Sequence, residues 1–323
     1  MTEVLERPAS DDRDRLFATA PEAVVDLSVP LGPLTLANPV MPASGCFGPE
    51  LGPLLPVREL GAVVTKTVFA QRRSGNPSHR LTESALGMLN SVGIPSPGTS
   101  RFVHEVLPRY REFGVPVIAS VGGLSVDEYW HVADELAGAE CAAFEVNVSC
   151  PNLEHDGLMI GADPAAVEAV VAGVVARTPL PVFVKLTPGV TDIGEIARAA
   201  ERAGATAVTV SNTFPALAVD VRTRRAVLGN GTGGLSGPAV KPLALRLVWQ
   251  AATAVDIPVI GCGGISSARD VAEFLIAGAT AVQVGTATFT RPYAMVDIVR
   301  DLARTCAELE VTAACELIGT LRA

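Results

Sequence analysis

Short runs of apolar residues recur along the chain from residue 39 onward, and most are followed by an amphipathic stretch. This rhythm indicates repeated β/α units and a parallel sheet. Several runs are almost continuously hydrophobic, which is typical of strands that are covered on both faces. Eight strands are predicted, at residues 40–42, 62–66, 116–121, 143–148, 182–187, 207–211, 257–261 and 281–285.

Polar residues mark where several of the intervening helices should begin. Ser125 and Asp192 each precede a glutamate by three residues, which is the spacing of a capping box. Asp163 offers a capping oxygen, and Pro164 then occupies the first helical turn. Eight strands that alternate with helices favour an α/β fold of the closed (β/α)8 TIM-barrel type over an open doubly wound sheet.

The residues before the first barrel strand divide into two parts. Residues 24–39 contain two short extended runs around Pro30-Leu31-Gly32-Pro33, which predicts a β-hairpin that closes the bottom of the barrel. Residues 1–22 are polar, mixed in charge and interrupted by Pro8 and Pro21, so they resemble neither a signal peptide nor a membrane span. We expect a flexible N-terminal tail at 1–22 and one barrel domain at 23–323.

Two segments interrupt the rhythm, residues 69–100 after the second strand and residues 213–238 after the sixth. Both are long and rich in Gly, Pro, Asn and Ser. Each follows the C-terminal end of its strand, where barrel enzymes build their active sites. These extended loops are therefore predicted to form walls of the site.

Composition narrows the possible partners and compartments. The 323 residues are 49% hydrophobic and carry a net charge of −9, without the basic stripe that nucleic acid or an anionic membrane would select. The six cysteines include no C-x-x-C pair and follow no secretory leader, which favours a reducing, cytoplasmic location. We expect no metal site, no nucleic-acid partner and no membrane partner.

Glycine-rich turns after the last two strands indicate a phosphate site. The sequence 261–266, Gly-Cys-Gly-Gly-Ile-Ser, follows one strand and opens a helix, and Gly285 and Thr286 end the next strand. In a barrel these loops adjoin, so their backbone N–H groups can cradle a phosphate, with Gly237 as a further donor. Such a site is compatible with isomerases and aldolases as well as with flavin enzymes.

Two lysines and an Asn-Cys-Asn segment supply candidate chemistry at other strand ends. Lys66 and Lys185 could be Schiff-base nucleophiles, could stabilise a reduced flavin, or could simply reach solvent. The run 147–152, Asn-Val-Ser-Cys-Pro-Asn, places two amides that could match a pyrimidine edge beside a thiol. Cys150 could act as a base if its pKa were lowered, or could be a buried structural cysteine.

Seven segments together resemble the class 1 dihydroorotate dehydrogenases, and within them the 1B catalytic subunit. The resemblance extends from about Val24 to Leu321. The segments are Asn-Pro-Val-Met-Pro-Ala-Ser-Gly-Cys-Phe-Gly (38–48), Gly-Asn-Pro (75–77), Gly-Met-Leu-Asn-Ser-Val-Gly-Ile (87–94), the 147–152 run, Val-Lys-Leu (184–186), Ser-Asn-Thr (211–213) and Gly-Gly-Leu-Ser-Gly-Pro (233–238).

The resemblance implies an FMN-dependent flavoprotein that oxidises dihydroorotate to orotate in pyrimidine (UMP) biosynthesis. It implies Cys150 as the catalytic base and Lys66 as a catalytic lysine that contacts both substrate and flavin. FMN is expected to contact Ser44, Lys66, Thr67, Ser120, Asn147, Lys185, Ser211, Gly237, Gly263, Gly264, Gly285 and Thr286. Dihydroorotate is expected to contact Lys66, Asn90, Ser91, Val92, Gly93, Ile94, Asn147, Asn152, Asn212 and Thr213.

The resemblance also implies partners. The membrane-associated, quinone-reducing class carries serine where this chain has Cys150. The 1B members form homodimers and work with a subunit that holds FAD and an iron-sulfur cluster and passes electrons to NAD. This chain has neither a cluster-binding cysteine set nor a Rossmann fingerprint, so a second subunit is expected to supply both cofactors. The 1A type would reduce fumarate instead.

Two departures from the 1B pattern leave a related dihydropyrimidine open as the substrate. Ser120 stands where 1B relatives carry asparagine, and residues 214–218 replace a stretch with glycine and arginine. Two other readings also stay open at this point, a phosphate-binding isomerase or aldolase without flavin and a non-catalytic barrel.

Overall fold

A closed ring of eight parallel strands forms the centre of the molecule. The computed structural model describes residues 25–149, 154–155 and 158–322, so the predicted tail at 1–22 lies outside the described residues. The strand order is β3 (Val40–Pro42), β18 (Ala279–Val284), β17 (Val259–Cys262), β12 (Ala207–Val210), β11 (Val182–Lys185), β8 (Ala143–Asn147), β7 (Val117–Val121) and β4 (Val63–Val64). The Gly61 N–H donates to the Val40 carbonyl at 2.9 Å and links the last strand to the first. All eight predicted strands, and with them the barrel, are confirmed.

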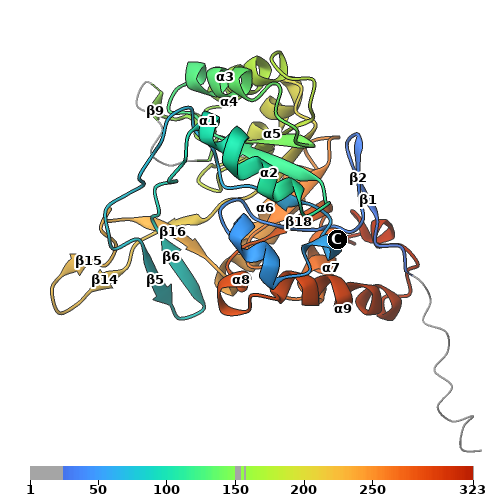
Figure 1. Cartoon of the computed structure of the whole chain (residues 1–323). Helices are drawn as coiled ribbons and strands as arrows, with labels where there is room; N and C mark the ends of the chain where they lie inside the picture. The colour runs from blue at the N-terminus through green and yellow to red at the C-terminus, as the bar shows by residue number, and fades with distance from the viewer. Residues whose placement is uncertain (1–24, 150–153, 156–157, 323) are drawn as a thin grey trace, which may run out of the picture.

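Helices follow the strands and pack around the barrel (Figure 1). The longer helices are α3 (Val126–Glu135), α4 (Pro164–Val175), α5 (Ile193–Arg202), α6 (Lys241–Ala252), α7 (Ala268–Ile276) and α9 (Ala294–Glu308). The Ser125 hydroxyl accepts from the Glu128 N–H at 3.2 Å, and the Asp163 carboxylate accepts from the Ala165 N–H at 3.0 Å. Asp192 caps α5 in the same way, so the three predicted helix starts are confirmed.

The remaining helical segments are short. They are η2 (Pro49–Leu54), η3 (Val57–Glu59), α1 (Thr99–Arg101), a π-helical turn η4 (Phe102–Val106), α2 (Leu107–Arg111), η5 (Ile160–Ala162), η6 (Pro238–Val240), α8 (Ala287–Thr290) and η7 (Ala314–Leu317). Two short strands, β9 (Glu154–His155) and β10 (Leu158–Met159), pair with each other after β8. None of the helices in the described ranges is long and apolar enough to cross a membrane.

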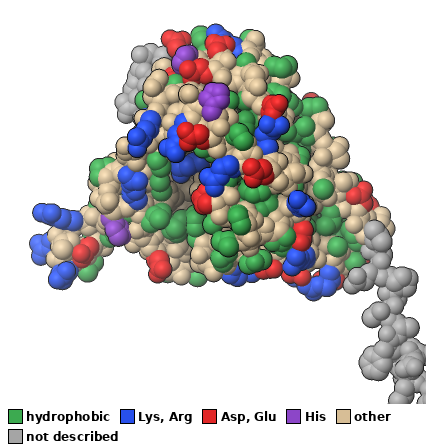
Figure 2. All heavy atoms as spheres, in the orientation of Figure 1, with side chains coloured by type: hydrophobic (Ala, Val, Ile, Leu, Met, Phe, Trp, Pro, Cys, Tyr) green, Lys and Arg blue, Asp and Glu red, His purple; other side chains and the backbone are tan. Residues whose placement is uncertain are grey.

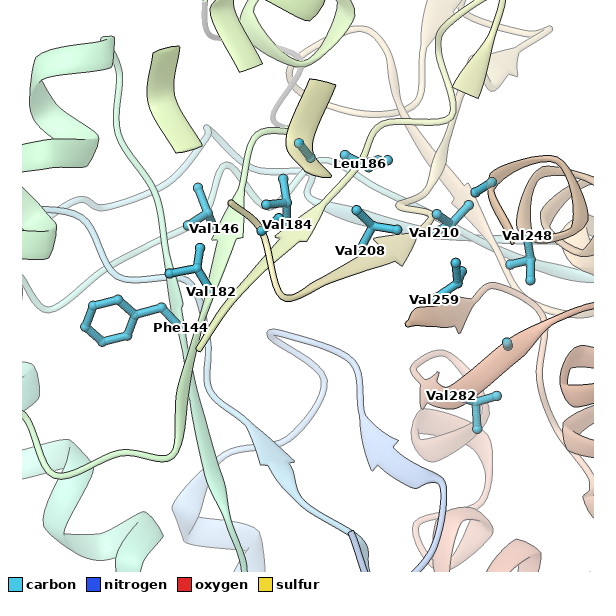
Figure 3. Close-up of a cluster of buried hydrophobic side chains, with 14 of the residues drawn as sticks. Phe144, Val146, Val182, Val184, Leu186, Val208, Val210, Val248, Val259 and Val282 are labelled. Atoms are coloured by element: carbon cyan, nitrogen blue, oxygen red, sulfur yellow. The ribbon is translucent and has the colours of Figure 1, made fainter. Parts of the chain in front are cut away.

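Alternation along the barrel strands separates two hydrophobic cores. One set of side chains faces the helices and is rich in valine, as Figure 3 shows for Val146, Val184 and Val208. The other set points into the barrel and includes Ile118 and Phe183. Period-two alternation in strands produces this division.

The N-terminal hairpin fills the bottom of the barrel. Strand β1 (Val29–Leu31) pairs with β2 (Leu34–Leu36) in antiparallel fashion, and Val29, Leu31 and Leu36 pack into the inner core. Gly32 turns the hairpin with φ +60°, and a Cβ there would lie 2.3 Å from Thr206 Cγ2. The predicted hairpin closure is therefore confirmed.

The two long segments after the second and sixth barrel strands pair with each other. They form a four-stranded antiparallel sheet in the order β13 (Phe214–Ala216), β16 (Gly233–Ser236), β6 (Gly87–Asn90) and β5 (Leu81–Ser84). A further hairpin, β14 (Val219–Asp220) with β15 (Arg225–Ala226), projects from this sheet (Figure 1), and Figure 2 shows positive side chains gathered at its tip. The segments predicted to wall one site thus lie side by side.

Candidate active site

Polar side chains occupy the inside of the barrel above the inner apolar core. On β8, Glu145 and Asn147 continue the inward-facing row that begins with Ala143. On β11, Lys185 follows inward-facing Phe183 by two residues. The C-terminal end of the barrel is therefore the polar end, as the sequence predicts for an active site.

Lys185 is a buried cation at this end. Its Nζ donates to Gln283 Oε1 at 2.7 Å and lies 3.7 Å from Cys262 Sγ. Burial acts to lower the pKa of Lys185, but Cys262, Glu145 and Cys46 act to raise it and together outweigh burial, so the pKa lies above the usual 10.5. A permanent positive charge at this place suits an anionic group above it.

Lys66 follows β4 and lies against the turn after β3. A Cβ placed on Gly45 would lie 3.6 Å from Lys66 Nζ. Burial has the largest influence and lowers the pKa of Lys66; Cys46 opposes this shift and Arg80 adds to it. The two lysines therefore approach the same end of the barrel with different electrostatic surroundings.

A chain of amides and hydroxyls crosses the mouth of the barrel. Asn147 donates through Nδ2 to Thr67 Oγ1 at 3.2 Å, and its Oδ1 accepts from Ser149 Oγ at 2.6 Å. Ser149 Oγ in turn accepts from Asn212 Nδ2, and Ser120 bonds to Thr67 on the far side at 2.9 Å. Two of the four predicted clamp asparagines are thereby brought together by a serine that the sequence reasoning did not single out.

The segment after β6 presents unused backbone donors. Gly93 and Ile94 have φ of +75° and +44°, a conformation that a β-branched residue rarely adopts. Asn76 holds this segment, since its N–H donates to the Val92 carbonyl at 3.0 Å and its Nδ2 to Ser91 Oγ at 2.9 Å. In the described part of the chain, the N–H groups of residues 92–94 donate to no protein group. Successive free N–H groups of this kind form anion-binding concavities.

The glycine-rich turns after β17 and β18 also leave donors free. Among the described residues, the N–H groups of Gly263, Gly264, Gly285 and Thr286 have no protein acceptor. Thr286 Oγ1 lies 2.8 Å from Ser236 Oγ, which ties this turn to the end of β16, directly before Gly237. These are the free donors that the predicted cradle requires, and α7 begins at Ala268, shortly after the first of the two turns.

Gly264 is required because of its own backbone conformation and the close approach of Lys241. A Cβ on Gly264 would lie 2.7 Å from the backbone N of Lys241, and φ is +76°. Gly264 lets the turn take a left-handed conformation against the start of α6.

The predicted site residues that the structure describes lie at the C-terminal ends of the barrel strands or on the added sheet, although their individual contacts with ligands stay predictions. Cys150 and Asn152 lie outside the described residues. The sequence reasoning missed Ser149, Glu145 and Gln283. A signal existed for two of them, because Glu145 and Gln283 are polar residues inside runs predicted as buried strands. Within the described ranges, no group of three or more His, Cys, Asp or Glu side chains could hold a metal ion.

Comparison with known proteins adds independent information. A family model described as dihydroorotate dehydrogenase matches residues 26–306. A protein of Desulforudis audaxviator named "Dihydroorotate dehydrogenase B (NAD(+)), catalytic subunit" is 48% identical over 298 residues, covering 91% of this chain and 97% of the relative. Proteins with the same name from Trichlorobacter lovleyi and Shouchella clausii are 48% and 44% identical, each over 91% of this chain and over 98% and 97% of their own length.

Proposed function

This chain belongs to the dihydroorotate dehydrogenase family, and from that premise we propose that it oxidises dihydroorotate to orotate in pyrimidine biosynthesis, with FMN as the hydride acceptor and Cys150 as the base. The observation that carries the proposal is the convergence of a buried lysine, linked amides and two sets of free backbone donors at one end of the barrel.

The residues present fit FMN. The free N–H groups of Gly263, Gly264, Gly285 and Thr286 suit its phosphate, and the buried ammonium of Lys185 suits the polar edge of its ring. Ser44, Thr67, Ser120, Asn147 and Ser211 are further expected contacts, together with Lys66 and Gly237. When bound, FMN supplies the two-electron chemistry that no side chain of this chain can perform.

The substrate is held by its carboxylate and by its ring amides. The free N–H groups of residues 92–94 and the Lys66 ammonium are donors that suit a carboxylate. Asn147, Asn152 and Asn212 present donors and acceptors to the ring N–H and C=O groups, with Asn90, Ser91 and Thr213 beside them. A ring fixed in this way can deliver one proton and one hydride along defined directions.

Cys150 removes the proton from C5 of dihydroorotate onto its Sγ while the hydride leaves C6. Cys150 follows Ser149 directly, and Ser149 is hydrogen-bonded to both Asn147 and Asn212. The linked serine therefore connects the ring-binding amides to the base. Lys66 stays protonated to neutralise the substrate carboxylate during the reaction.

The electrons are passed on by a second protein. The relatives are named as catalytic subunits of an NAD(+) enzyme, which supports a separate electron-transfer subunit with FAD and an iron-sulfur cluster. We include a homodimer of this chain in the proposal, from the family resemblance. The isolated chain should reduce artificial dyes and transfer electrons poorly to NAD.

The decisive test is anaerobic addition of dihydroorotate to the purified yellow protein. Bleaching of bound FMN supports the proposal, whereas bleaching only by another dihydropyrimidine would reassign the substrate. A colourless protein that cannot be loaded with FMN would refute it.

Cys150 is tested by stopped-flow bleaching of bound FMN across pH. Cys150→Ala should bind dihydroorotate nearly as tightly as the wild type but reduce its flavin roughly a hundred- to ten-thousand-fold more slowly. The rate of flavin reduction in Cys150→Ser should recover in part at high pH, because an alcohol is a weaker acid than a thiol. A Cys150→Ala rate near that of the wild type would assign the base to another group.

A further inference from the structure

Three buried polar side chains are linked across the inside of the barrel, one layer below the mouth. Lys185 on β11 donates to Gln283 Oε1 on β18 at 2.7 Å. Gln283 Nε2 donates to Glu145 Oε2 on β8. An ammonium can only donate and a carboxylate can only accept, so the two charges fix which end of the Gln283 amide faces each partner.

The linkage is costly to bury, which points to a role beyond stability. Glu145, Gln283 and Lys185 are 0%, 1% and 3% exposed. Thr209 Oγ1 donates to Glu145 Oε2 at 3.0 Å, but Glu145 Oε1 has no hydrogen-bond partner among the described residues. An unsatisfied buried carboxylate oxygen lowers stability, and apolar side chains could fill this layer at less cost.

Glu145 is the acidic side chain that is linked to Lys185, through Gln283. The other groups that could oppose its charge are the sulfurs of Cys262, on β17, and Cys46, after β3. Burial raises the pKa of Cys262 and raises that of Cys46 to about 11, so both are neutral thiols near pH 7. Thr209, on β12, and Ser211, directly after it, carry no charge.

We propose that Glu145, acting through Gln283, is a positioning residue that keeps Lys185 protonated and holds its ammonium toward the mouth of the barrel. The consequence for FMN rests on the proposed function above. With this carboxylate in place, Lys185 carries its charge before the substrate arrives and does not have to acquire a proton during the reaction. The hydride and the C5 proton of the substrate are then the only hydrogens that move.

The chain offers a direct readout, because its only lysines are Lys66, Lys185 and Lys241. Protein labelled with ¹³C at lysine Cε gives three signals that can be followed through a pH titration by NMR. Lys66→Met and Lys241→Arg assign two of them, which leaves Lys185. In the wild type the Lys185 signal should stay that of an ammonium through pH 9.

Glu145→Gln removes the charge and keeps the shape of the side chain. Lys185 should then lose about a hundredfold or more in proton affinity, within the range documented for buried lysines without a counter-ion. Thr209→Val is the matched control, because it removes a hydrogen bond to the same carboxylate and leaves the charge and the Gln283 contact in place. The Lys185 signal of Thr209→Val should titrate as in the wild type.

Gln283→Met breaks the linkage and leaves both charges in the barrel, so it provides the decisive test if Glu145→Gln fails to fold. It should lower the proton affinity of Lys185 in the same direction and by a smaller factor. A Lys185 titration that is the same as in the wild type, in whichever of these two variants folds, overturns the proposal.

The potential of bound FMN gives a second readout. With Lys185 charged throughout, a two-electron reduction takes up one proton, so the midpoint potential should fall by about 30 mV for each tenfold drop in proton concentration. In Glu145→Gln a second proton should be taken up at pH values above the lowered pKa of Lys185, which doubles the slope in that alkaline range to about 59 mV. If the slope in Glu145→Gln equals that of the wild type, Glu145 does not control proton uptake on reduction of FMN. Failure to bind FMN or to bleach with dihydroorotate would refute the proposed function alone, since the NMR titration does not depend on either.

Discussion

Removing the Ser149 hydroxyl should loosen the amide chain at the mouth of the barrel without disturbing the fold. Ser149 Oγ donates to Asn147 Oδ1 at 2.6 Å and accepts from Asn212 Nδ2. In Ser149→Ala, Asn147 Oδ1 keeps only the Ser149 backbone N–H, at 3.2 Å, and Asn212 keeps its bond from the Thr213 N–H, at 2.8 Å. Both amides stay in place but lose the contact that fixes them relative to each other.

The size of the effect follows from two lost hydrogen bonds. Each contributes about 0.5–1.5 kcal/mol net, so roughly 1–3 kcal/mol of positioning is lost. At 1.36 kcal/mol for each factor of ten, kcat/KM for dihydroorotate should fall by about 5- to 150-fold. The rate of FMN bleaching at saturating substrate should fall as well, because the ring then reaches the reactive geometry less often.

The assay is stopped-flow bleaching of FMN under anaerobic conditions over a range of dihydroorotate concentrations. Ser120→Ala, compared after both variants have been saturated with FMN, is the control, since Ser120 is also a buried hydroxyl and bonds to Thr67, one contact farther from Asn147. Ser120→Ala should lose clearly less than Ser149→Ala. If Ser149→Ala keeps both the rate and the affinity of the wild type, or if Ser120→Ala loses as much, the amide chain does not position the substrate.

Two further predictions concern the support of the phosphate loop. Gly264→Ala should destabilise the protein by about 3 kcal/mol or more in urea unfolding, because left-handed backbone strain of about 1–2 kcal/mol adds to the steric overlap with Lys241. Gly114→Ala is the control, because Gly114 has φ +70° but open space around it, so this variant should show the strain alone. Equal losses of stability in the two variants would contradict the overlap with Lys241. Although burial acts to raise the pKa of Asp270, hydrogen bonds from Lys241, Ser266 and Ser267 lower it below 3.8, so its stabilisation is present above pH 3.8 and is lost as pH falls through the lowered pKa. The difference in Tm between the wild type and Asp270→Asn should therefore shrink in that acid range, and a constant difference would show that the ionisation of Asp270 contributes nothing.

The barrel was predictable because its signals are local. Each strand is a short apolar run, and each capped helix begins at a polar residue whose partner is two or three positions away. The pairing of Asn90 with Gly234 joins residues that are 144 positions apart, and nothing in either segment specifies the other. That the two long segments share one sheet therefore emerges only from the folded chain.

The site was predictable residue by residue but not as a set of contacts. Glycines, lysines and asparagines at strand ends could be read from the sequence, because the ends of parallel strands meet at one edge. The Glu145–Gln283 contact depends on the stagger between β8 and β18, which lie on different sides of the ring, and strand stagger is a property of the closed barrel. The role of Gly264 likewise depends on how closely the start of α6 approaches.

The inner apolar core and the polar site above it are built from the same barrel strands. Phe183 belongs to the same inner core as the N-terminal hairpin, and Lys185 lies two residues farther along the same inward row of β11. Ala143 and Glu145 have the same relation on β8. Tight packing below therefore sets the height and tilt of both strands, which in turn sets the Lys185–Gln283–Glu145 contacts above. A hydrogen bond fails over less than 1 Å, whereas an apolar contact tolerates such a shift. The hairpin at the closed end is thus a determinant of the electrostatics at the open end, although no residue of it reaches the site.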